Sequence, residues 1–78
     1  MNAKQALKLV EARRLAASGD GKTVREAAGL SLHEVAAVIG LSVSGLFRWE
    51  NGERVPRGER AVAWAELLGQ LADTRRAS

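Results

Sequence analysis

The stretch LHEVAAVIGLSVSGLFRWEN, residues 32–51, decides the fold of this chain. A capping box made by Ser31 and Glu34 opens a first helix. Gly40 ends that helix, because glycine readily adopts the left-handed conformation found at helix ends, and Ser42 caps a second helix. The sequence therefore predicts two short helices joined by the turn GLS, the first over residues 32–39 and the second from residue 43 to a stop at Gly52.

The second of these helices has two unlike faces. At about 100° of turn per residue, Leu46 and Trp49 share one face, while Phe47 and Arg48 point away from it. Ala36 on the first helix would lie where the two helices cross, because only a small side chain lets the two backbones approach closely. Short helices joined by a glycine-containing turn are the sequence form of a helix-turn-helix, although any small α-helical bundle uses similar signals.

Two further helices are expected before this pair. The first is expected over residues 3–17, where Ser18 and Gly19 end it, and four of its residues lie on one side: Leu7, Val10, Arg14 and Ala17. A shorter helix is expected to end at Ala28, because Gly29 suits the position after a helix. Its start stays open between three possible caps, Ser18, Asp20 and Thr23, the last of which would form a capping box with Glu26.

A fifth helix is expected after the loop ERVP, residues 53–56. It carries one apolar stripe of Trp64, Leu68 and Leu71, with Ala61 and Ala65 beside it. It should end before the polar tail DTRRAS, which we expect to be disordered. Strand signals are missing, so the predicted fold class is all-α. The expected organisation is an N-terminal helix (1–17) that joins a dimer or completes the core, a helix-turn-helix domain (18–72) and a tail (73–78).

Composition narrows the possible functions. A chain of 78 residues closes one modest core, so a large catalytic pocket is not expected. With no cysteine and a single histidine, neither a disulfide framework nor the usual metal cluster can form, and no cofactor is expected. The segment SGDGKT resembles the end of a phosphate-binding loop, but Ala16 stands where the pattern needs glycine. No set of nucleophile and base indicates an enzyme. No membrane span or secretion signal is found, so we expect a soluble, cytosolic protein.

The charge balance suggests an acidic partner. The net charge is +3 and the isoelectric point is near 10.2. Six of the basic residues lie between Lys4 and Arg25, and four lie between Arg48 and Arg60. Such an excess is typical of proteins that bind nucleic acid, although many basic domains bind nothing acidic.

Residues 25–58, REAAGLSLHEVAAVIGLSVSGLFRWENGERVPRG, resemble the Cro/C1-type helix-turn-helix family, also called the Xre family, of phage repressors and bacterial transcription regulators. The matching features are GLS before the first motif helix, Ala36 and Gly40 inside the motif, and WENG at its end. The resemblance covers roughly residues 18–72 and implies a small five-helix bundle of the lambda-repressor-like type. Leu32 departs from the family, which often has at this position a glutamine that touches a DNA phosphate.

The resemblance also implies a structural ion pair between Arg25 and Glu50. Glu50 lies on the same side of its helix as Leu46, and an unpaired carboxylate near the core would be costly. Two separately solvated charges are the alternative interpretation.

On the helix that the family uses to read DNA, the outward face is the candidate site for base contacts: Val43, Ser44, Phe47 and Arg48. Candidate phosphate contacts lie at helix starts and just beyond this helix: Ser31, Ser42, Asn51, Arg54 and Arg57. Phe47 could instead pack under the first helix or in a dimer contact. The serines could be caps only, and the arginines could simply be solvated.

The function implied is a sequence-specific regulator that binds double-stranded DNA in a bacterial cell or phage-infected host. A repressor that binds a two-fold symmetric operator as a homodimer fits the family, with the N-terminal helix, Val62 and Leu67 as candidate interface residues. The alternative is a protein-binding module, such as an antitoxin, whose DNA binding is secondary and autoregulatory and whose partner is a toxin.

Overall fold

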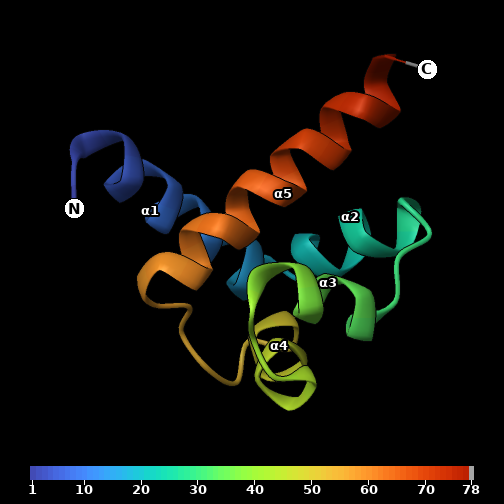
Figure 1. The fold of residues 1–78 in the computed structure, drawn as a ribbon, viewed down its shortest axis with the longest axis horizontal. Coiled ribbons are helices and arrows are strands. Elements are labelled where there is room, and N and C mark those ends of the chain that lie inside the picture. Colours follow the sequence, from blue (N-terminus) through green and yellow to red (C-terminus); the bar gives the residue numbers. More distant parts are fainter. Residues whose placement is uncertain (78) are drawn as a thin grey trace.

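The computed structural model describes residues 1–77, and its regular structure consists of five helices. The all-α fold class is therefore confirmed. Figure 1 shows α5 (Gly58–Ala77) crossing the molecule and projecting beyond the other helices at its C-terminal end, whereas α4 (Val43–Glu50) lies at the opposite edge. Within the described part, no helix is long and apolar enough to cross a membrane. The helices are α1 (Ala3–Ser18), α2 (Asp20–Ala27), α3 (Leu32–Ile39), α4 (Val43–Glu50) and α5 (Gly58–Ala77).

One hydrophobic core joins these helices. Trp64 of α5 is completely buried at its centre and packs against Trp49 of α4, with ring centroids 5.3 Å apart. Gly21 lets α2 approach the same ring, because a Cβ at this position would lie only 2.6 Å from a Trp64 carbon. The buried residues of this cluster are Ala12, Leu15, Ala16, Val35, Ala36, Ile39, Leu46, Trp49, Ala61, Trp64, Ala65 and Leu68.

The side of α1 that carries Leu7 and Val10 faces solvent, with 71% and 64% of these residues exposed. The core is reached instead by Ala12, Leu15 and Ala16. Two of these three residues are alanines, whose small side chains allow α1 to lie close to α5, whereas Leu15 is the large core residue of this face. The N-terminal helix therefore completes the core with one face and leaves an apolar face open.

None of the three possible caps occupies the N-cap position of α2, although Ser18 Oγ accepts a hydrogen bond from the Asp20 backbone N–H at 3.2 Å. The residue before the helix is Gly19, in the left-handed conformation with φ 82°, and it provides no side-chain cap. Thr23 lies inside the helix, where its hydroxyl donates to the carbonyl of Gly19 at 3.4 Å, so the expected capping box with Glu26 is wrong. The helix itself ends at Ala27, one residue before the expected end.

The motif helices form as the sequence predicts. Ser31 Oγ accepts a hydrogen bond from the Glu34 backbone N–H at 3.1 Å, and Glu34 Oε1 accepts one from the Ser31 N–H at 2.9 Å. Gly40 ends α3 with φ 75°, and Ser42 Oγ caps α4 by accepting from the Gly45 N–H at 3.0 Å. α4 ends at Glu50, slightly earlier than the expected stop at Gly52.

The fifth helix is longer and more buried than expected. It runs to Ala77, so the expected end before residue 73 is wrong; Ser78 lies outside the described residues. No glycine or proline interrupts residues 73–77, so nothing in that segment stops a helix. Val62, expected to be exposed, is only 7% exposed, and Leu67 is half-buried, because α1, α2 and α3 all pack against α5.

Candidate nucleic-acid interface

The outward face of α4 is open to solvent. Ser44 and Arg48 are exposed. Phe47, the only phenylalanine of the chain, is 50% exposed, although a large apolar ring would ordinarily be buried. Leu46 and Trp49 lie on the inner face and are buried in the core. The helix is thus held by two large apolar side chains, and its other side carries an aromatic ring, a hydroxyl and a guanidinium group.

Val43, the fourth candidate for a base contact, lies differently. It is half-buried and packs against the core at the start of α4. The structure therefore brings three of the four candidates together on an open face and places the fourth at its inner border.

Arg25 and Glu50 form the expected ion pair. Arg25 Nε donates to Glu50 Oε2 at 2.7 Å, and Nη2 donates to Oε1 at 3.0 Å. A third bond runs from Arg25 Nη1 to the carbonyl of Leu30 at 2.9 Å. The hydrogen bonds to Glu50 raise the pKa of the Arg25 guanidinium above its ordinary value. The pair joins α2 and the segment before α3 to the end of α4, and so fixes how α4 is presented.

Three of the candidate phosphate contacts lie around one hollow beside the start of α4. Ser42, Arg54 and Arg57 line this depression of ≈ 490 Å³ together with Leu41, Gly45, Trp49 and Val55. The hollow places a helix N-terminus, whose free N–H groups favour anions, next to two guanidinium groups. This arrangement suits a phosphate of a nucleic-acid backbone.

The other two phosphate candidates lie outside that hollow. Asn51 follows α4, and its side-chain amide donates to the carbonyl of Phe47 at 2.8 Å. Ser31 is at the start of α3, where its hydroxyl serves the capping box. Both side chains are exposed, so the structure leaves them accessible while also giving each a local role.

Sequence reasoning missed Arg60. It lines a second hollow that shares Leu41, Trp49 and Arg57 with the first, and its Nε would lie 3.7 Å from a Cβ placed on Gly40. The available signal was its spacing, because Arg60 follows Arg57 by three residues at the start of α5. Among the described side chains, no acidic group forms an ion pair with Arg54, Arg57 or Arg60, although Glu59 lines the second hollow as well.

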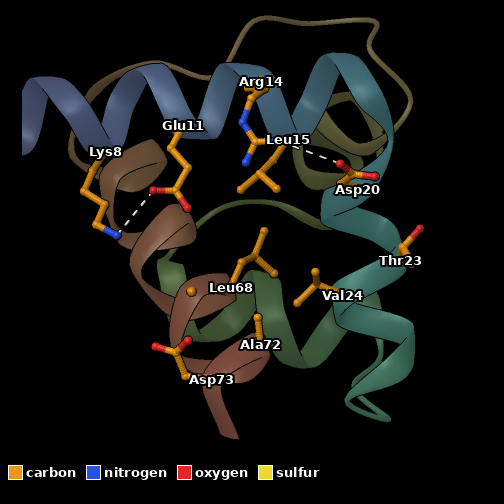
Figure 2. Close-up of a pocket in the computed structure, with 11 residues that line it drawn as sticks. Lys8, Glu11, Arg14, Leu15, Asp20, Thr23, Val24, Leu68, Ala72 and Asp73 are labelled. Atoms are coloured by element: carbon orange, nitrogen blue, oxygen red, sulfur yellow. Dashed lines mark hydrogen bonds and ion pairs between the residues drawn. The ribbon is translucent and has the colours of Figure 1, made fainter. Parts of the chain in front are cut away.

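A separate groove of ≈ 490 Å³ lies between α1, α2 and α5 (Figure 2). Leu15, Val24 and Leu68 point into it from the three helices. Two ion pairs are at its rim, Lys8 with Glu11 at 3.3 Å and Arg14 with Asp20 at 3.8 Å. None of its lining residues belongs to α3 or α4, so this groove is distinct from the open face of α4. Within residues 1–77, no group of three or more acidic or histidine side chains is arranged to hold a metal ion.

Comparison with known protein families gives a match. The model of a helix-turn-helix family matches residues 22–72, which include α3 and α4 completely and leave α1 outside. No match was found among curated proteins or among solved structures.

Proposed function

Since the chain belongs to the Cro/C1-type helix-turn-helix family of DNA-binding regulators, we propose that it is a sequence-specific repressor of transcription. The observation that carries the proposal is the open face of α4, where Ser44, Phe47 and Arg48 are accessible while Leu46 and Trp49 hold the helix in the core. A helix supported in this way fits the major groove of double-stranded DNA.

Each exposed side chain of α4 suits a different feature of a base pair. The Phe47 ring packs on a thymine methyl group, and Arg48 donates to O6 and N7 of one guanine. Ser44 bonds to either class of base, and Val43 provides a second apolar contact at the start of the helix. Each good contact is worth about 1–3 kcal/mol of discrimination against the wrong base.

Affinity comes largely from the DNA backbone. Neutralising phosphates releases their counterions, so binding becomes strongly salt-dependent. The groups assigned to phosphates are Ser31, Ser42, Asn51, Arg54 and Arg57, and Arg60 joins them because it shares a hollow with Arg57. Glu53 and Glu59 lie among these groups and must turn away from the backbone when DNA is bound.

A homodimer on a two-fold symmetric operator completes the proposal. One eight-residue helix reads few bases, and two copies read half-sites about one helical turn apart. With Val62 buried, the open face of α1, with Leu7 and Val10, is the better candidate for the dimer contact. The site of action is the cytoplasm of a bacterial cell or of a phage-infected host. The same apolar face would serve the alternative function, binding of a toxin by an antitoxin.

Selection of bound sequences from random duplex DNA, followed by a salt titration of the selected duplex, tests this function. The proposal predicts enrichment of a two-fold symmetric motif and an affinity that falls steeply with salt. If no sequence is enriched, the assignment as a sequence-specific repressor is wrong. Nanomolar binding to a protein partner together with sequence-indifferent DNA binding would favour the antitoxin.

A further inference from the structure

The loop that carries Arg54 and Arg57 is held by a residue far away in the sequence. Arg13 of α1 donates a hydrogen bond from Nε to the carbonyl oxygen of Pro56 at 3.2 Å, across 43 residues of chain. Pro56 itself is completely buried, whereas its neighbour Val55 is 54% exposed. Figure 1 shows this loop leading from the end of α4 back to the start of α5. One of its anchors is therefore a charged side chain on another helix.

The start of the same loop also lies close to α1. Gly52 adopts φ 71°, and a Cβ on it would lie 3.7 Å from the carbonyl oxygen of Ala16. The backbone N–H groups of Gly52 and Glu53 bond back to α4, at Trp49 and Arg48. The two ends of the loop are thus fixed, one mainly by α4 and the other by Arg13, and Arg54 lies between these two anchors.

We propose that Arg13 is a positioning residue for DNA binding: it holds the loop so that Arg54 and Arg57 already lie where the phosphate backbone will pass. This inference rests on the proposed function. The helix that performs this task lies outside the segment that the family model matches, residues 22–72. α1 thus contributes to DNA binding indirectly, because it supports the loop and does not itself contact DNA.

The physical reason is the entropy of ordering. A loop that is mobile before binding must be immobilised when its side chains meet the ligand, and this ordering weakens the complex. A hydrogen bond from a charged donor is stronger than one between neutral groups, so Arg13 is a suitable anchor. Its loss frees the backbone around Pro56 while leaving both loop arginines in the chain.

The neighbouring Arg14 provides a matched control. Replacing either arginine by glutamine removes one positive charge from the same turn of α1. Arg14, however, points into the groove between α1 and α2, where it pairs with Asp20 at 3.8 Å (Figure 2). Both partners of that pair are largely exposed, so its loss has little effect on the fold.

Limited proteolysis of the full chain with trypsin tests the structural half of the proposal. Arg13→Gln should speed cleavage after Arg54 about fivefold or more, because a freed loop enters the protease readily. Arg14→Gln should leave that rate unchanged. Cleavage after Lys22, inside α2, should be the same in both variants, which shows that the whole fold has not opened. Equal rates after Arg54 in the two variants would overturn the proposal.

DNA binding then separates positioning from direct contact. On the selected duplex, Arg13→Gln should weaken binding about tenfold, while Arg14→Gln changes it less than about twofold. In a chain that carries both Arg54→Gln and Arg57→Gln, adding Arg13→Gln should have almost no further effect. A tenfold loss in that background would mean that Arg13 contacts DNA itself or acts on the whole fold, and would overturn the proposal.

The two kinds of failure are distinguishable. If Arg54→Gln and Arg57→Gln weaken binding but Arg13→Gln does not, only the role of Arg13 is wrong. If the unmodified chain shows no salt-dependent binding to any duplex, the proposed function fails, and the role of Arg13 in DNA binding fails with it whatever trypsin shows.

Discussion

Arg25 and Glu50 meet through two parallel hydrogen bonds, of 2.7 and 3.0 Å, with 7% of the arginine and 4% of the glutamate exposed. The pair lies where the first helix of the family-matched segment, α2, touches the last residue of α4. Because Glu50 belongs to the same helix as Arg48 and follows it by two residues, the pair fixes the open face relative to the rest of the domain. A buried charge also makes each partner depend on the other.

Removing one partner should therefore be costly. We expect Glu50→Leu or Arg25→Met alone to lower the free energy of unfolding by about 3–5 kcal/mol, because each leaves an unpaired buried charge. The double variant Arg25→Met/Glu50→Leu should lose much less than the sum of the two. Urea unfolding followed by the fluorescence of Trp49 and Trp64 measures these values. Additive losses of under about 1 kcal/mol each would show two independent solvated charges.

The capping box of α3 should make stability depend on pH. The pKa of Glu34 lies below its ordinary value. The larger cause is the hydrogen bond from the Ser31 backbone N–H, and the smaller cause is the interaction with the Ser31 hydroxyl. A carboxyl group with a depressed pKa stabilises the fold fully at a pH above its ordinary, unfolded-state pKa. This contribution is lost as the pH falls through the lower pKa of the folded protein. Glu34→Gln keeps an uncharged acceptor at every pH. The variant should lose less stability than the unmodified chain between about pH 5 and pH 3, measured by urea unfolding. Identical losses would mean that the folded protein leaves this carboxyl unperturbed.

The local signals explain why α3, its turn and α4 were predictable. The caps Ser31 and Ser42 and the terminating Gly40 act within a few residues, so they can be recognised in the sequence alone. The inner face of α1 was not readable in this way. Leu7 and Val10 are larger and more apolar than Ala12 and Ala16, but close packing against α5 selected the smaller residues for the core.

The site shows the same division. The resemblance to the family indicated the Arg25–Glu50 pair, and helical spacing indicated the open face with Phe47. The place of Arg60 in the site became visible only from the position of the start of α5, which brings this side chain close to Gly40. The hydrogen bond from Arg13 to Pro56 spans 43 residues. Contacts between segments so far apart leave no periodic pattern in the sequence. Only the assembled fold reveals them.

Base preference should change when Arg48 is shortened. Arg48→Ala removes a group that can donate two hydrogen bonds to one guanine, so discrimination at that base pair should fall by about 1–3 kcal/mol. We expect one position in each half-site to become degenerate when selection from random duplexes is repeated with this variant. The other positions should be unchanged. If the selected motif is unaltered, Arg48 does not contact a base.

Arginines beyond α4 should affect all sequences alike. Arg54→Ala, Arg57→Ala and Arg60→Ala should each weaken specific and random duplexes by the same factor and lower the salt slope by about one. Arg14→Ala, on the groove side of α1, is the control and should leave the slope unchanged. If base preference changes for any of the three variants, that arginine contacts a base edge. If the salt slope is unchanged, that arginine does not contact a DNA phosphate.

The proposed function requires the open face of α4 to lie against base edges when DNA is bound. Nuclear magnetic resonance of the chain bound to its selected duplex tests it most directly, through nuclear Overhauser effects from the Phe47 ring. The ring is half exposed in the free protein, and we predict cross-peaks from its protons to a thymine methyl group in the major groove. Cross-peaks from the ring only to the protein's own side chains, in a complex whose DNA contacts come from another face, would mean that α4 does not read the bases.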